Sequence, residues 1–318
     1  MGAAHHLAGW SDAHHRRGQA AVLRFHRRCR RPRPVPATVT AAQHATAKEC
    51  RDVKDRLGTR ALRLIGGVAF ATVGLRRLCR WGPAYASSPY RIRIAGATVS
   101  TWNLDTLSWS LREVFLQQSY EVGNLPAGAR IVDVGANMGI SSLYFLRRHL
   151  GSTVLAVEPD DHAFALLTSL AGQFRERLSV LQCAAASQNG RINLHREPNK
   201  PGKLTASINP GAGRVQHIEV RAQRLSELLA GFVVVDLLKM DVEGAETEIL
   251  HDLIVTGTVR RIHRIVLEVH PGPVEAERVE ELLDRAGFRY EEQPGTRSES
   301  DGTYLLHAVN CSPATDGR

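Results

Sequence analysis

Residues 130–139 read RIVDVGANMG, a short β-rich run that ends in a glycine-rich turn. Asp133 stands just before the turn, and Gly135 and Gly139 allow a ligand to approach the backbone where a helix begins, so that its amides favour a polar or anionic group. The dinucleotide fingerprint G-x-G-x-x-G is not met, because asparagine takes the middle position and a serine the place of the last glycine. Nicotinamide binding is therefore disfavoured.

The sequence on either side of this stretch alternates between strand-like and helix-like runs. Further strands are expected at residues 153–157, 178–184, 218–222, 232–240, 262–269, 288–292 and 303–309, and helices at 107–120, 141–150, 161–174, 245–253 and 274–286. A strand or hairpin is expected over residues 90–99, and irregular structure or a small hairpin over 187–213. This alternation predicts an α/β fold with a doubly wound, mostly parallel sheet that binds ligands at the carboxyl ends of its strands.

Glu158 ends the predicted strand 153–157. An acidic residue at the end of the second strand of such a fold is well placed to accept both hydroxyls of a ribose. The structural alternative is a carboxylate that the dipole of the following helix favours. Together with the glycine-rich turn before it, Glu158 is better interpreted as a ribose ligand.

Ionisable residues also follow the apolar run 232–240, which is expected to be a central strand buried on both faces. Lys239 and Asp241 end that strand and Glu243 lies just beyond, where charges are seldom placed without pairing or function. Asp241 could orient a donor or take a proton from an acceptor hydroxyl, and the alternative is a helix cap. His270 ends the next strand, after Glu268, as a base, a substrate ligand or a structural histidine.

The net charge of +9 is divided unevenly along the chain. Residues 1–90 hold 17 Lys and Arg against 4 acidic residues, whereas residues 91–318 hold 24 against 28. The basic character therefore belongs to the N-terminal part and says little about the chemistry of the rest.

Three segments are predicted from these patterns: a basic, disordered tail over residues 1–60, an amphipathic helical segment over 61–86 and a catalytic domain over 87–310. The uncharged core of the second segment is too short to span a bilayer, so it is expected to lie at the headgroup level or to pack against the domain. Residues 24–80 leave open a peripheral contact with an anionic membrane. The five cysteines are widely spaced without a C-x-x-C pair, which fits a cytoplasmic protein, peripheral at most at the inner face of the membrane.

Three motifs, VDVGANMG at 132–139, AVEPD at 156–160 and LKMDVEGAE at 238–246, resemble in order and spacing those of the FkbM family of S-adenosylmethionine-dependent methyltransferases. The resemblance covers residues 90–295 and includes a lead-in with Glu113 and Tyr120. It implies the seven-stranded class I methyltransferase fold, which is Rossmann-like, and S-adenosylmethionine as the cofactor. No metal is required by the pattern.

The resemblance also implies roles for single positions. Residues around the methionine part of the donor would be Asp133, Gly135, Asn137 and Gly139. Glu158 would hold the ribose, and Cys183 and Ala184 with the residue after them would line the adenine pocket. Asp241 would stand nearest the transferred methyl, with Glu243 behind it or facing the acceptor.

The expected activity is O-methylation of a hydroxyl on a sugar, a glycolipid or a secondary metabolite, with a small-molecule, glycan or glycolipid acceptor. One alternative is a nucleic-acid methyltransferase that uses the basic N-terminal arm. It is disfavoured because the motif-bearing part is acidic and lacks an N/D-P-P-Y/W sequence. The other alternative is a non-catalytic, membrane-associated partner protein, against which the intact acidic and glycine positions argue.

Overall fold

The computed structural model describes residues 85–196, 216–270, 273–299 and 302–311, which all belong to one compact unit. The predicted tail (1–60) lies outside the described residues, as does nearly all of the predicted helical segment (61–86). Its last two residues, Tyr85 and Ala86, already belong to a strand. No helix within the described ranges is long and apolar enough to cross a membrane.

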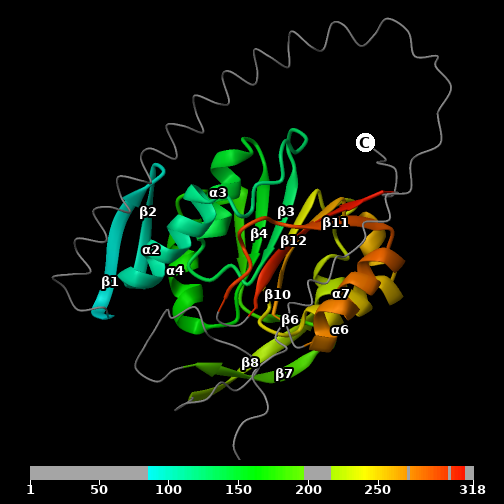
Figure 1. Cartoon of the computed structure of the whole chain (residues 1–318). Helices are drawn as coiled ribbons and strands as arrows, with labels where there is room; N and C mark the ends of the chain where they lie inside the picture. Colours follow the sequence, from blue (N-terminus) through cyan, green and yellow to red (C-terminus); the bar gives the residue numbers. More distant parts are fainter. Residues whose placement is uncertain (1–84, 197–215, 271–272, 300–301, 312–318) are drawn as a thin grey trace, which may run out of the picture. The chain divides into compact units, whose positions relative to one another are not determined.

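A seven-stranded sheet forms the centre of the described unit (Figure 1). Its strands are β3 (Arg130–Val134), β4 (Thr153–Val157), β5 (Leu178–Leu181), β9 (Leu237–Met240), β10 (Arg264–Val269), β11 (Phe288–Glu292) and β12 (Tyr304–Asn310), in the order β11-β12-β10-β9-β3-β4-β5. The other strands of this sheet all run in one direction, and β12 alone runs in the opposite direction, antiparallel to β10 and β11. The predicted class I methyltransferase architecture is confirmed, and the strand order reverses between β3 and β9, where such sheets bind ligands.

Helices cover both faces of this sheet (Figure 1). One face packs against α2 (Leu104–Leu111), α3 (Ile140–Arg148) and α4 (Asp161–Ala171), the other against α5 (Leu225–Leu228), α6 (Glu246–Val255) and α7 (Pro273–Arg285). Because successive strand residues point to opposite faces, Ile131 joins the first of these cores and its neighbour Val132 the second. Both are buried, which explains the continuous apolar runs in the sequence.

Two smaller sheets complete the unit. The hairpin of β1 (Tyr85–Ile94) and β2 (Ala97–Asn103) confirms the hairpin expected at residues 90–99. β6 (Ala184–Ala186), β7 (Gly190–Arg196) and β8 (Gln216–Arg224) form a three-stranded sheet, in which β8 lies in the middle. Of the segment expected to be irregular or to form a hairpin, residues 197–213 lie outside the described part.

Two strand predictions were wrong in extent. The strand expected at residues 178–184 is divided, because β5 joins the large sheet and β6 the small one. The strand expected at 232–240 is only β9: Val233 is 66 % exposed and Val235 makes a single bridge, to Ile262. The helix expected at 107–120 begins earlier, because Asn103 caps α2 by accepting from two backbone amides, and it continues beyond α2 as a π-helical turn, Arg112–Leu116.

Candidate active site

A cavity of about 640 Å³ lies at the carboxyl ends of β3, β4, β9 and β10. This volume is within the range of roughly 300–1,000 Å³ that is usual for small-molecule sites. Most of the residues predicted for the site line it, namely Gly135, Asn137, Glu158, Cys183, Ala184, Asp241, Glu243 and His270. Asp133 and Gly139 do not line the cavity.

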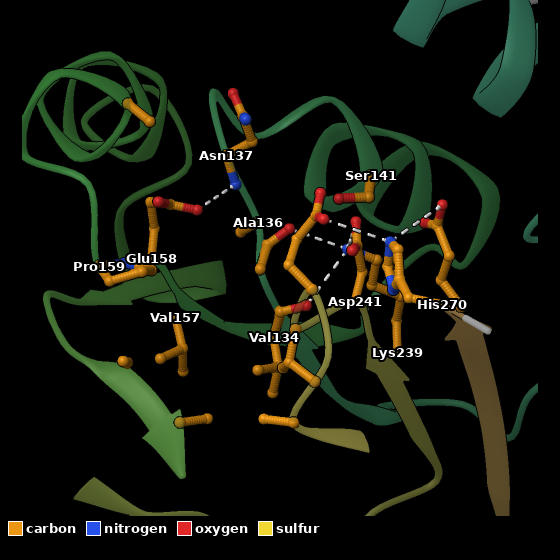
Figure 2. A pocket seen from close by; sticks show the side chains of 18 of the residues that line it. Val134, Ala136, Asn137, Ser141, Val157, Glu158, Pro159, Lys239, Asp241 and His270 are labelled. Atoms are coloured by element: carbon orange, nitrogen blue, oxygen red, sulfur yellow. Dashed lines mark hydrogen bonds and ion pairs between the residues drawn. The ribbon is translucent and has the colours of Figure 1, made fainter. Parts of the chain in front are cut away.

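Glu158 marks one side of the cavity (Figure 2). Its carboxylate accepts a hydrogen bond from the Asn137 N–H at 2.7 Å and another from the Asp160 N–H at 2.8 Å. Burial raises the pKa of this carboxyl to about 8, although the two backbone hydrogen bonds oppose the rise. An ionised carboxylate has about four acceptor positions, so Glu158 keeps capacity for two more donors, which fits a ribose diol.

Asp133 lies beneath the cavity, with no exposed surface. It accepts hydrogen bonds from the hydroxyls of Ser141 and Ser142 at 2.7 and 2.6 Å, and so it fastens the start of α3 to the end of β3. Its other oxygen is 3.6 Å from Nζ of Lys239. Asp133 thus positions the end of β3, and its predicted contact with the donor stays a prediction.

The two glycines of the turn serve different purposes. Gly135 has φ +71°, and a Cβ on it would lie 1.9 Å from the carbonyl oxygen of Asp241. Gly139 has φ +91°, and a Cβ there would lie 2.7 and 2.9 Å from the side chains of Leu170 and Leu167. Gly135 thus lets the ends of β3 and β9 meet at the cavity, whereas Gly139 lets α3 approach α4.

Small, buried residues form the wall beyond Glu158. Cys183 and Ala184 are 1 % and 6 % exposed and line the cavity together with Ala185. Burial raises the pKa of the Cys183 thiol to about 11, so it is neutral at physiological pH. A neutral, apolar wall suits the flat face of an adenine ring, and the adenine role of these residues stays a prediction.

Asp241, Glu243 and His270 gather on the opposite side of the cavity; Figure 2 labels Asp241 and His270 there. Glu243 has φ +53°, an uncommon backbone for a residue other than glycine, and its Oε2 is 3.4 Å from Nε2 of His270. Nδ1 of His270 bonds Oε1 of Glu246 at 2.8 Å. Burial and the charge of Asp241 raise the pKa of Glu243 to about 7.

The protonation of His270 bears on its predicted role. Burial lowers the pKa of the imidazole, but the hydrogen bond to Glu246 and the nearby carboxylates of Glu243 and Glu268 raise it to about 10. In this structure His270 is therefore a cation at neutral pH and donates toward the carboxylates. It is not poised as a general base, and its role as a ligand stays a prediction.

Four residues that line the cavity had been given no role from the sequence: Trp109, Glu113, Tyr120 and Glu268. Trp109 is 54 % exposed. Burial and the charge of Asp241 raise the pKa of Glu113 to about 7, and the same effects raise that of Glu268 well above its usual range. Acidic residues buried beside a cavity are the signal that could have found them, but it appears only once the chain is folded.

The comparisons with known proteins agree with this geometry. Residues 133–290 match the family model described as the Methyltransferase FkbM domain. The chain is 30 % identical over 226 residues to the 31-O-demethyl-FK506 methyltransferase FkbM of Streptomyces tacrolimicus, an alignment that covers 61 % of this chain and 86 % of that protein. The chain belongs to the FkbM methyltransferase family.

Two further relatives are similar to this chain. Methyltransferase sdnD of Sordaria araneosa is 29 % identical over 208 residues, which are 56 % of this chain and 80 % of that protein. The 2-O-methyltransferase NoeI of Sinorhizobium fredii is 28 % identical over 135 residues, 38 % and 55 % of the two chains. This chain is therefore an S-adenosylmethionine-dependent methyltransferase.

The cavity fits that cofactor. The free acceptor capacity of Glu158 suits the ribose, the wall of Cys183 and Ala184 suits the adenine, and the close approach at Gly135 leaves backbone exposed beside Asp241. These residues would hold the donor beside Asp241.

Removing the ammonium of Lys239 beneath the cavity should destabilise the protein. Lys239→Met leaves the carboxylate of Asp133 buried without a counter-ion, and we expect a loss of about 3–5 kcal/mol in the free energy of unfolding. The double variant with Asp133→Asn should lose less than the sum of the single losses, since the orphaned charge is gone. Urea denaturation measures both, and a Lys239→Met protein as stable as the wild type would contradict this account.

Two alanine variants distinguish the steric effect of a side chain at Gly135 from the effect of its left-handed backbone conformation. Gly257 has the same φ, +71°, but a Cβ there would meet no atom within 4 Å. Gly257→Ala should therefore cost only about 1 kcal/mol, whereas Gly135→Ala must push the ends of β3 and β9 apart. We expect a larger loss of stability and a marked loss of donor binding for Gly135→Ala alone, measured by urea denaturation and calorimetry. Equal effects in the two variants would refute the steric argument.

Donor binding should depend on pH through Glu158. Its carboxyl is neutral below about pH 8, and the ionised form accepts hydrogen bonds from a diol more strongly. Affinity for S-adenosylmethionine should therefore rise with pH, by at most about tenfold per unit, and level off above pH 8. Glu158→Gln should bind weakly with a flatter profile, whereas Glu281→Gln on the exposed face of α7 should behave as wild type. Calorimetry between pH 6 and 9 tests this, and an unchanged profile in Glu158→Gln would exclude Glu158 as the source.

Proposed function

We propose that this enzyme methylates a hydroxyl oxygen on a sugar, a glycolipid or a secondary metabolite. The observation that carries the proposal is the composition of the cavity beyond Asp241. There the half-exposed Trp109 stands with the carboxyl groups of Glu113 and Glu268 and the hydroxyl of Tyr120. An aromatic surface together with several hydrogen-bond acceptors suits a compact molecule that carries hydroxyl groups.

S-adenosylmethionine supplies a methyl group on a positively charged sulfur, which an oxygen nucleophile attacks in line. The residues of the chain contribute mainly by holding the donor and the acceptor in position for this attack. Asp241 stands between the donor side and the acceptor side, and Lys239 fixes its carboxylate at 3.4 Å. The acceptor hydroxyl loses its proton as the new C–O bond forms, and Glu113, a carboxyl of the cavity with a pKa of about 7, is suited to accept it.

The names of two relatives support oxygen as the target atom. One is named a 31-O-demethyl-FK506 methyltransferase and another a 2-O-methyltransferase. The charge of the chain supports a small acceptor over a nucleic acid, because residues 91–318, which hold the cavity, carry 28 acidic against 24 basic residues. A phosphate backbone would meet net repulsion there.

A transfer assay tests this proposal. The full chain is incubated with S-adenosylmethionine labelled in its methyl group and with a panel of glycosides, glycolipids and macrolide alcohols, with RNA and DNA oligonucleotides as competing acceptors. We expect label on an oxygen of a hydroxylated small molecule. Label recovered on nucleic acid or on nitrogen would overturn the proposal.

Trp109→Ala sharpens the test of the acceptor site. Loss of an aromatic contact worth about 0.5–1.5 kcal/mol should raise the KM for the acceptor roughly two- to tenfold. The dissociation constant of S-adenosylmethionine should not change, and Trp109→Phe should retain most of the affinity. A weakened donor affinity with an unchanged acceptor KM would place Trp109 on the donor side instead.

A further inference from the structure

Three potential metal ligands lie together at the acceptor side of the cavity. Asp241 and Glu243 follow β9, and His270 ends the neighbouring strand β10. One ligand atom from each, two carboxylate oxygens and an imidazole nitrogen, can be chosen so that all lie within 4.8 Å of one another. We propose that these residues bind a divalent metal cation, although the sequence motifs alone gave no reason to expect one.

The spacing suits such an ion. Ligand atoms about 2.1 Å from one ion lie roughly 3 to 4 Å apart when they occupy adjacent or opposite positions. Oε2 of Glu243 is already 3.4 Å from Nε2 of His270.

His270 is oriented as histidine ligands of metals usually are. Such a histidine binds the metal through one ring nitrogen and donates from the other to a carboxylate or carbonyl. Here Nδ1 is held at 2.8 Å by Oε1 of Glu246, a residue with no exposed surface. The same oxygen accepts from the Gly244 N–H at 3.0 Å, which fixes it in turn. Nε2 is therefore the nitrogen directed at the carboxylates.

A separate observation comes from Tyr120, which belongs to the lead-in rather than to the cluster. The residue is only 4 % exposed and lines the same cavity. Its hydroxyl opens onto the cavity and makes no hydrogen bond within the described part of the chain. A water or hydroxyl bound to the metal would supply a partner.

The charges around the site also call for a cation. Carboxyl groups of Glu113 and Glu268 line the cavity beside the three ligands, and Oε1 of Glu268 is 4.0 Å from Nε2 of His270. The ammonium of Lys239 pairs with Asp241 at 3.4 Å, and its other contacts are two carbonyl oxygens and Asp133 beneath the cavity. A metal ion that displaces the Nε2 proton of His270 would take the place of that imidazolium and compensate Glu243 and Glu268 as well.

The donor set indicates the class of metal. Carboxylates suit Mg²⁺ and Mn²⁺, whereas an imidazole favours later first-row ions such as Zn²⁺. A site with two carboxylates and one histidine should therefore prefer Mn²⁺ and Zn²⁺ to Mg²⁺. Binding requires neither the donor nor the acceptor, so the test is independent of the proposed O-methylation.

The experiment titrates the full chain, stripped with a chelator, with Mn²⁺, Zn²⁺ and Mg²⁺ in turn. Calorimetry follows all three, and electron paramagnetic resonance follows Mn²⁺. We expect one site per chain, with Mn²⁺ affinity reduced at least tenfold in Glu243→Gln and in His270→Ala. Glu246→Gln should also weaken it, by about 10–100-fold, since it disturbs the residue behind the ligand.

Matched controls change the same residue types elsewhere. Glu277→Gln and His251→Ala alter exposed positions on α7 and α6 and should bind Mn²⁺ as the wild type does. Circular dichroism verifies that each variant is folded, and Glu243→Gln, which changes a partly exposed side chain by one atom, keeps the test valid if His270→Ala fails to fold. No saturable binding of Mn²⁺ or Zn²⁺ to the wild type, or binding that survives Glu243→Gln, would overturn the proposal.

Discussion

The buried ammonium of Lys239 is the interaction on which the site depends. The residue is 2 % exposed, and its Nζ donates to the carbonyl oxygens of Val134 and Gly135 at 3.2 and 2.8 Å. It also lies 3.6 Å from Asp133 and 3.4 Å from Asp241. Burial lowers the pKa of this amine, but the carboxylates of Asp241 and Asp133 raise it by more, so the amine stays protonated. One charge thus joins the ends of β3 and β9 where the strand order reverses.

The cavity has two sides with different chemical surroundings, and Asp241 lies between them. On the side of Glu158, two backbone amides hold one carboxyl group, and the wall beyond it consists of small apolar residues. On the side of His270, recognition rests on carboxylates that repel one another and raise one another's pKa. Asp241, between the two sides, is held by Lys239 at 3.4 Å.

The sequence was sufficient for the fold and for the residues that end strands. Glu158, Asp241 and His270 could be predicted because parallel strands bring their carboxyl ends to the same edge of a sheet. Gly135 and Gly139 could be predicted as a turn, but not as serving a backbone contact in one case and a helix contact in the other.

Other features depend on contacts between distant parts of the chain. Glu113 and Tyr120 reach the cavity from the segment that follows α2, and no periodicity in that segment specifies which strand end it meets. The apolar run 232–240 predicts a single strand, yet only Leu237–Met240 forms one; before it, Val235 makes an isolated bridge to Ile262 and the carboxylate of Asp236 accepts from the Arg130 N–H. A run of apolar residues reports burial but not the neighbour that buries it.

The segment after β9 is the most constrained part of the site, and its geometry links both proposals. Glu243 occupies a left-handed conformation that costs energy, and Gly244 beside it has φ +107°. Glu246, at the start of α6, is completely buried and holds His270. A tight turn that brings two carboxylates and a supported imidazole into one cavity is more than a helix cap requires. The conformation is understandable if these groups together hold something positively charged next to the atom that is methylated.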